Sequence, residues 1–135
     1  MCTVLVCGGR NYGLNWDAAT LQWLIDEDAC DFLRSTLTDL HAQRGFTLLL
    51  HGAARGADTL AEFWAITHHI KPQAYKAEWK RFGQSAGPRR NEHMLVDGKP
   101  MLVVAFKGDK GTKNMIDIAR RARVEVITPG WEYER

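Results

Sequence analysis

The sequence lacks any apolar run near the roughly 20 residues that a membrane-spanning helix needs. It also lacks a strong charge of either sign, since 18 Lys and Arg against 16 Asp and Glu leave a net charge of +2. Such a balance argues against attraction of the whole molecule to nucleic acid or to an anionic membrane. We therefore expect a protein that neither enters a membrane nor binds nucleic acid strongly.

Metal-binding patterns are missing as well. The three cysteines (Cys2, Cys7 and Cys30) form no metal-type pair, and the histidines lack ligand spacing with cysteine or carboxylate residues. No metal site is predicted. Reduced, buried thiols in a cytoplasmic protein are the expectation, and a catalytic Cys7 at the end of a strand is the alternative.

The chain has the size and composition of one globular domain, which we expect to span residues 1–135. It is 45% hydrophobic and 25% charged, and it carries no internal repeat, linker or low-complexity segment. The first ten residues are too short for a signal peptide and are typical of a first strand.

Continuously apolar runs predict strands that are buried on both faces. The predicted strands lie at residues 3–7, 47–50, 101–106 and 124–128, with a weaker one at 73–77. Helical patterns separate them, and this alternation is typical of a parallel sheet covered by helices. The predicted fold class is α/β, with a mostly parallel sheet of about five strands and helices on both faces.

The helical patterns differ in clarity. Leu21, Leu24 and Ile25 continue in helical spacing to about Gln43, which predicts helix after a cap at Asn15 or Asp17, interrupted near the acidic residues 26–31. Gly45 is expected to end this segment in a left-handed conformation. A second helix is predicted at 57–69, with an inward face of Leu60, Phe63, Trp64, Ile66 and Thr67.

The second half of the chain is less regular. Residues 78–94 are predicted to be irregular, ending in a short helix that begins near Pro88. A helix at 114–122 should turn Met115, Ile116, Ile118 and Ala119 toward the sheet. The tail at 129–135 either packs or frays.

Three of the predicted strands lead directly into loops that contain glycine, at residues 8–12, 52–58 and 107–112. The carboxyl ends of parallel strands lie along one edge of a sheet, so we expect these loops to converge. Glycine lets backbone amides approach a phosphate closely. None of the loops has the P-loop pattern or a full dinucleotide fingerprint, so neither ATP hydrolysis nor simple dinucleotide binding is predicted.

The candidate ligand-binding residues are those that this edge would bring together: Gly8, Gly9, Arg10, Tyr12, His51, Gly52, Arg55, Gly56, Asp58, Trp79, Gly87, Arg89, Arg90, Asn91, Gly108, Asp109, Gly111 and Thr112. Arginines offer forked donors to phosphate, and aromatic rings offer stacking faces, although core packing explains an aromatic residue equally simply. His51 is either an acid or base or a structural histidine. Asp58 either caps a helix or accepts from a ribose hydroxyl, and Thr112 caps its helix, donates to the ligand, or does both.

Four blocks in this order resemble the SLOG superfamily, most closely its YspA/cpYpsA-related branch. They are GGRNY at 8–12, HGAARGAD at 51–58, EWKRFGQSAGPRRNEHM at 78–94 and AFKGDKGTKNM at 105–115. The superfamily includes the Lonely Guy phosphoribohydrolases and DNA-processing protein A. The resemblance implies a Rossmann-like three-layer sandwich, a nucleotide or nucleotide-derived ligand in the glycine-loop cleft and no required cofactor.

The chain departs from the Lonely Guy pattern where that family has a Pro-Gly-Gly-x-Gly-Thr loop and a catalytic Glu three residues later. Lys107 replaces the Pro, Asp109 replaces the second Gly, and Met115 stands at the position of the Glu. Arg90 matches the arginine that those enzymes place beside the scissile bond. A thioether cannot act as a carboxylate does, so an enzyme would need Asp58, Glu92 or Asp109 in its place.

These observations leave three hypotheses. The preferred one is a module that binds a nucleotide or a signalling nucleotide without efficient turnover. The second is an N-glycosidase or phosphoribohydrolase acting on nucleoside monophosphates through Arg90 and one of the three carboxylates. The third is single-stranded nucleic-acid binding through the basic and aromatic residues of 79–90, which the near-neutral total charge disfavours. Pairing of two copies through Trp16 and Trp23 is a further expectation, and core packing explains these residues as well.

Overall fold

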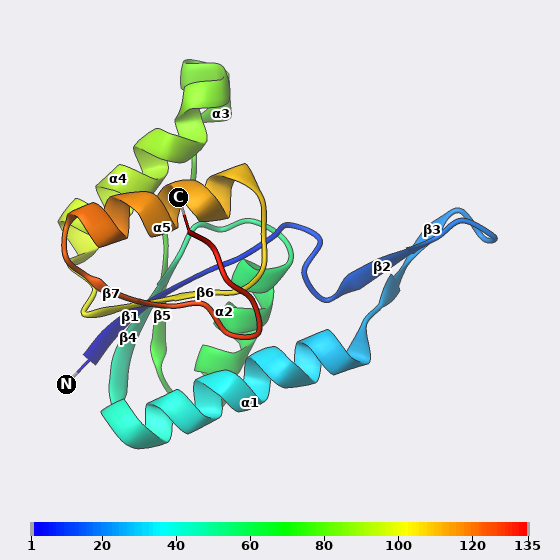
Figure 1. Cartoon of the computed structure of the whole chain (residues 1–135), viewed down its shortest axis with the longest axis horizontal. Coiled ribbons are helices and arrows are strands. Elements are labelled where there is room, and N and C mark those ends of the chain that lie inside the picture. Colours follow the sequence, from blue (N-terminus) through cyan, green and yellow to red (C-terminus); the bar gives the residue numbers. More distant parts are fainter. Residues whose placement is uncertain (1, 135) are drawn as a thin grey trace.

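The fold is built around a five-stranded parallel sheet (Figure 1). A computed structural model describes residues 2–134 of the chain. The strands are β1 (Cys2–Cys7), β4 (Phe46–His51), β5 (Lys71–Ala74), β6 (Leu102–Ala105) and β7 (Glu125–Ile127), in the order β5-β4-β1-β6-β7. Every neighbouring pair in this sheet is parallel. The predicted α/β class and strand number are confirmed.

Helices cover both faces of the sheet (Figure 1). On one side lie α1 (Glu27–Arg44) and α2 (Ala57–Thr67), and on the other lie α4 (Ala86–Gly98) and α5 (Lys110–Arg121). Because side chains alternate along a strand, Val4 and Val6 pack against the α1 and α2 side, whereas Leu5 packs with Met94 and Met115 of α4 and α5. The three layers are those of a Rossmann-like fold.

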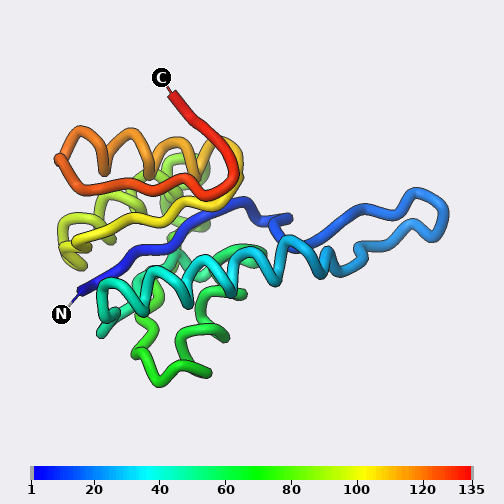
Figure 2. Tube along the Cα trace, turned by 60° about the horizontal axis from the view of Figure 1, so that its bottom comes forward, coloured from blue at the N-terminus to red at the C-terminus, as the bar shows by residue number. Residues whose placement is uncertain are grey.

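Residues 14–25 form a β-hairpin, so the helix predicted there is wrong. Its strands are β2 (Leu14–Asp17) and β3 (Gln22–Ile25), and both views show it extending away from the sheet (Figures 1 and 2). Trp16 pairs with Trp23 across the strands, with ring centroids 5.4 Å apart. The Asp17 carboxylate caps no helix and accepts from Ala19 N and Thr20 Oγ1 in the turn.

Helix α1 is continuous and begins at Glu27, so the predicted acidic interruption is also wrong. Asp26 is its N-cap, with a side-chain oxygen 3.1 Å from Ala29 N. Glu27 and Asp28 lie in the first turn, where negative charge interacts favourably with the helix dipole. Gly45 ends the helix in a left-handed conformation, as predicted.

Helix α2 buries a face that shares Trp64 and, in part, Leu60 with the predicted one and excludes the rest of it. The buried residues are Ala57, Asp58, Ala61, Trp64 and Ala65. Phe63 is 63% exposed and Ile66 is 54% exposed. Small alanines let the helix approach the sheet closely, and hydrophobicity alone does not identify such a face.

Residues 79–98 are mostly helical, which corrects the predicted irregular segment. Helix α3 (Trp79–Phe82), the 3₁₀ turn η1 (Gly83–Ser85) and α4 follow one another. Gly83, at φ +55°, marks the change of direction after α3. Pro88 and Gly87 lie within the first turn of α4, where a proline is tolerated because its missing N–H would have no partner.

The remaining boundaries shift only slightly, and the tail packs at Trp131 and Tyr133, while residue 135 lies outside the described residues. The weak strand predicted at 73–77 lies at Lys71–Ala74, and α5 begins at Lys110, so Thr112 lies in its first turn and does not cap it. Trp131 Nε1 donates to Ala105 O at 2.8 Å, and Arg120 Nη1 donates to Tyr133 O at 2.6 Å. None of the helices in residues 2–134 combines the length and apolar character needed to cross a membrane.

Candidate functional site

The three glycine loops meet at the carboxyl edge of the sheet, as predicted. Gly9 N donates to Lys107 O at 3.0 Å, and Ala57 N donates to Gly9 O at 3.3 Å. Gly56 has φ +83°, and a Cβ there would lie 2.3 Å from Gly9 O. This contact requires glycine on both conformational and steric grounds.

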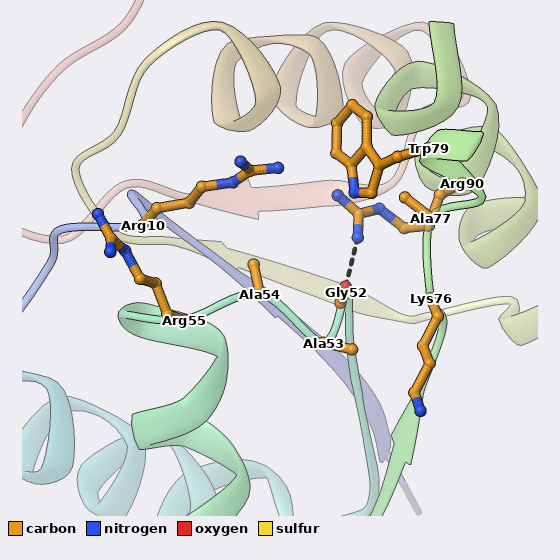
Figure 3. A pocket seen from close by; sticks show the side chains of 9 residues that line it. All are labelled: Arg10, Gly52, Ala53, Ala54, Arg55, Lys76, Ala77, Trp79 and Arg90. Atoms are coloured by element: carbon orange, nitrogen blue, oxygen red, sulfur yellow. Dashed lines mark hydrogen bonds between the residues drawn. The ribbon is translucent and has the colours of Figure 1, made fainter. Parts of the chain in front are cut away.

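A hollow of about 650 Å³ opens beside these loops. Figure 3 shows the nine residues that line it: Arg10, Gly52, Ala53, Ala54, Arg55, Lys76, Ala77, Trp79 and Arg90. They come from the loops after β1, β4 and β5 and from α3 and α4. The third glycine loop, after β6, contacts Gly9 and contributes no lining residue.

The hollow carries four cationic side chains and no acidic one. The cations are Arg10, Arg55, Lys76 and Arg90, and none of them forms an ion pair with any residue in the described part of the chain. Unpaired like charges in one concavity produce a positive potential that attracts anions.

Arg90 is the most firmly held of the four. Its Nη1 donates to Gly52 O (Figure 3) and, at 3.4 Å, to Tyr75 O, and its Nε donates to Asn91 Oδ1 at 2.9 Å. Burial lowers the pKa of the guanidinium, Arg10 lowers it further, and Asp58 opposes both effects. A Cβ on Gly52 would lie 2.4 Å from Arg90 Nη1, so this position leaves little room for a side chain.

Asn91 links Arg90 to the glycine loop that does not line the hollow. Its side chain is buried, and its Nδ2 donates to Gly111 O at 3.1 Å and to Asn114 Oδ1 at 3.0 Å. The start of α5 therefore orients Asn91, and Asn91 in turn orients the guanidinium of Arg90.

Trp79 forms an aromatic wall. Arg10 Cζ lies 5.0 Å from its ring centroid, which is cation–π distance. A Cβ on Gly87 would lie 3.3 Å from the edge of the ring, so the glycine lets α4 pass close to it. The indole is 47% exposed, and a planar ligand group could stack on it.

The loop after β4 does not offer the cradle of free amides that the sequence suggested. Asp58 Oδ2 accepts from Gly52 N at 3.1 Å and from Ala54 N at 3.2 Å. Ala53 N donates to His51 Nδ1 at 3.0 Å. The loop already surrounds an internal carboxylate, which leaves the binding of a ligand phosphate to side-chain cations.

Asp58 and His51 bond within and beside the β4 loop, and neither lines the hollow. Asp58 is buried and does not line the hollow; burial raises the pKa of its carboxyl, and the amide of Ala54, His51 and Arg90 oppose that rise. His51 Nδ1 accepts a hydrogen bond from Ala53 N, which assigns the ring proton to Nε2. His51 Nε2 then donates a hydrogen bond to Glu62 Oε1 at 3.0 Å.

Other predicted ligand residues lie beside the hollow without lining it. A Cβ on Gly8 would meet Ala57 Cβ at 2.5 Å. Tyr12 OH donates to Ala29 O at 3.2 Å, and burial raises the pKa of this tyrosine to about 12. Arg89 donates to Ser85 and covers the Phe82 ring at 4.4 Å.

The loop at 107–112 is a support for the site. A Cβ on Gly108 would meet Thr112 Oγ1 at 2.2 Å and Gly9 N at 2.7 Å. Thr112 is buried, whereas Gly111 and Asp109 are exposed. Asp109 is the N-cap residue of α5 and makes no side-chain cap bond.

None of the three carboxylates proposed to replace the hydrolase Glu lines the hollow: Asp58 is bonded internally, and Glu92 and Asp109 lie on exposed positions outside it. Met115 is fully buried in the core between α5 and the sheet. Burial, followed by the charge of Asp58, raises the pKa of the Cys7 thiol, which opposes a thiolate nucleophile at this position. Within residues 2–134, no His, Cys, Asp or Glu side chains gather in a group that could hold a metal ion.

Four lining residues, Ala53, Ala54, Lys76 and Ala77, were not among the predicted ligand-binding residues, although Ala53 and Ala54 lie in the predicted loop at 52–58. Lys76 and Ala77 follow β5, which carries no glycine loop. The rule that predicted the site also applies to them, because the residues after every parallel strand reach the same edge.

Fold and site together define a Rossmann-like α/β protein with a cationic hollow at the carboxyl edge of its sheet. A sequence model of the YspA, cpYpsA-related SLOG family matches residues 2–82. The chain belongs to this family, as its sequence blocks indicated. The matched part contains every lining residue except Arg90.

The chain is also similar to the Gene 61 protein of Mycobacterium phage D29. It is 30% identical over 138 residues, which cover 96% of this chain and 98% of that protein. Its name states no ligand or reaction. The similarity over nearly the full length of both chains extends beyond the residues matched by the family model.

Proposed function

We propose that this protein binds a nucleotide or nucleotide-derived ligand, such as a signalling nucleotide, in the hollow lined by Arg10, Trp79 and Arg90. The observation that carries the proposal is the combination of four unpaired cations with an exposed indole in one concavity. The cations suit phosphate oxygens, and the indole suits a base. Membership of the SLOG family supports a nucleotide-related role.

Binding without turnover is the form of this function that the geometry favours. Hydrolysis of an N-glycosidic bond needs a carboxylate close to the sugar, to stabilise positive charge or to activate water. No acidic residue lines the hollow, and Asp58 already accepts from two amides. A phosphoribohydrolase would have to bring a carboxylate in from outside.

Single-stranded nucleic acid is a weaker candidate for the ligand. The basic segment at 80–90 is present, but Arg81 and Arg89 cover the Phe82 ring at 4.8 and 4.4 Å. Two arginines therefore compete with a second base for that ring, whereas one arginine, Arg10, approaches Trp79, and a run of stacked bases needs more than one platform.

Isothermal calorimetry with purified protein tests the proposal. The ligands are nucleoside mono-, di- and triphosphates, cyclic dinucleotides and ADP-ribose. We expect at least one ligand to bind at micromolar concentration, and we expect Arg10→Ala to weaken it about tenfold or more, since a charge-assisted contact is lost.

Arg89→Ala is the matched control, because Arg89 is an exposed arginine near the hollow that does not line it. It should leave the affinity within about twofold of the wild-type value. Absence of any binding at millimolar concentration would reject the proposal. Release of free base from a monophosphate would instead establish the hydrolase.

A further inference from the structure

The hollow holds its cations in a spread arrangement. Arg10 and Arg90 lie near Trp79 in the middle of the hollow (Figure 3). Arg55 lies next to Arg10, and Lys76 lies at the other end of the hollow, past Gly52. In this view Arg90 and Gly52 lie between Arg10 and Lys76.

The central pair has unused hydrogen-bond donors. Arg90 uses Nη1 and Nε for Gly52, Tyr75 and Asn91, and its Nη2 donates to no residue of the described chain. The Arg10 side chain likewise makes no hydrogen bond within residues 2–134, and its charge is close enough to lower the pKa of Arg90. An anion between these two guanidinium groups would satisfy the donors and relieve their repulsion.

An anion between Arg10 and Arg90 leaves the other two cations of the hollow, Arg55 and Lys76, without an anionic partner. Arg55 Nη2 donates to a neutral partner, Asn11 Oδ1, at 2.6 Å, and Lys76 makes neither a hydrogen bond nor an ion pair with the described residues. A nucleoside monophosphate brings at most about two negative charges, on one phosphorus. The hollow of about 650 Å³ is within the usual size range of small-molecule pockets.

We infer that the ligand carries at least two linked phosphate groups, as in a nucleoside diphosphate or a nucleotide with an internal pyrophosphate. One phosphate lies between Arg10 and Arg90, and the chain of phosphates continues toward Lys76. This inference rests on the proposed function and specifies its ligand class. A monophosphate fills the central position alone.

Calorimetry with paired ligands tests the inference. The pairs are the mono- and diphosphates of adenosine, guanosine, cytidine and uridine, so that the base is held constant within each pair. For the base that binds best, we expect the diphosphate to bind about tenfold or more tightly than the monophosphate.

Two lysine variants locate the second phosphate. Lys76→Ala should weaken the diphosphate about fivefold to tenfold and change the monophosphate less than about twofold. Lys80→Ala removes an exposed lysine of α3 that does not line the hollow, and it should change neither affinity. Both positions are exposed, so neither substitution should impair folding.

The outcomes separate this inference from the proposed function. Equal or tighter binding of the monophosphate would overturn the inference and leave nucleotide binding intact. A Lys76→Ala effect of the same size on both ligands would overturn the assignment of the second phosphate to that lysine. Failure of every nucleotide to bind would overturn both.

Discussion

At the scale of single residues, Asp58 decides what the β4 loop can bind. Its carboxylate accepts from Gly52 N and Ala54 N and so takes the place that a phosphate would take in a free amide cradle. Anion recognition then falls to Arg10, Arg90 and their neighbours. A sequence cannot reveal this exchange, because glycine and a nearby aspartate are compatible with either arrangement.

Replacement of Asp58 should separate its acceptor role from its charge. Asp58→Ala leaves two amides in a buried loop without their acceptor, and we expect it to lower the free energy of unfolding by about 2–4 kcal/mol at neutral pH. Asp58→Asn keeps an acceptor oxygen and should lose less. Urea unfolding followed by circular dichroism measures both; equal losses would show that the charge matters more than the hydrogen bonds.

Comparison of the wild-type protein with Asp58→Asn also predicts a pH dependence of stability. Burial raises the folded-state pKa of Asp58 above its unfolded value of about 3.9, so the folded protein holds this proton at a pH where the unfolded chain has lost it. The Asp58 contribution to stability therefore falls as pH rises from the unfolded pKa through the folded one. Asp58→Asn should lack this component, and the wild-type advantage over it should shrink with rising pH. An unchanged difference across that range would contradict the raised pKa.

At the scale of elements, the β1 and β4 loops and the start of α2 act as one packed unit. Gly56, at φ +83°, brings the start of α2 against Gly9 O and Arg10 O, where a Cβ would lie 2.3 and 2.6 Å from these oxygens. Both contacts are with backbone, which cannot rotate away as a side chain can. The position of Arg10 in the hollow therefore depends on this glycine.

Two glycine substitutions test that dependence. Gly56→Ala should reduce stability by about 2–4 kcal/mol, because the loop or the helix must move. Gly111→Ala is the matched control: no atom lies within 4 Å of its Cβ position, it is helical, and alanine there should be neutral or stabilising by up to about 1 kcal/mol. Urea unfolding measures the free energy of unfolding of both variants. Equal values for Gly56→Ala and Gly111→Ala would contradict the packing argument.

The hairpin at residues 14–25 contributes little to the core. None of these residues is buried, and none belongs to either core cluster. We expect a variant in which Asn-Gly replaces residues 15–24 to unfold cooperatively, with a free energy of unfolding within about 1 kcal/mol of wild type. Loss of the urea transition would show that the hairpin is part of the folding unit.

This hairpin also shows where sequence analysis fails and why. Leu21, Leu24 and Ile25 have helical spacing, yet the structure exposes all three. The pairing of Trp16 with Trp23 and the Asp17 turn determine the local structure, and neither leaves a periodic signal. Strands β1, β4 and β6 were predictable because burial on both faces leaves long apolar runs.

At the scale of the whole molecule, strand order explains why the site could be located from sequence. With the order β5-β4-β1-β6-β7, the loops after β1, β4 and β5 neighbour one another at one edge. Parallel topology predicted that the loops after β1, β4 and β6 meet at this edge, but β6 lies on the other side of β1 from β4, and the β5 loop lines the hollow in its place. Which side chains turn into the hollow was not predictable, because Arg89 and Arg90 are adjacent in α4 and only Arg90 lines it.

The contrast between a net charge of +2 and four cations in one hollow predicts selective, salt-sensitive stabilisation by polyanions. Inorganic pyrophosphate at about ten times its dissociation constant should add about 1.4 kcal/mol of stability, which raises Tm by about 3–5 °C. Differential scanning fluorimetry at low salt measures this shift, with sulfate as the reference anion. Arg10→Ala should lose most of the shift, Arg89→Ala should keep it, and about 0.5 M NaCl should reduce it in every variant. An equal shift in the two arginine variants would mean that pyrophosphate binds elsewhere on the surface, because only Arg10 of this pair faces the hollow.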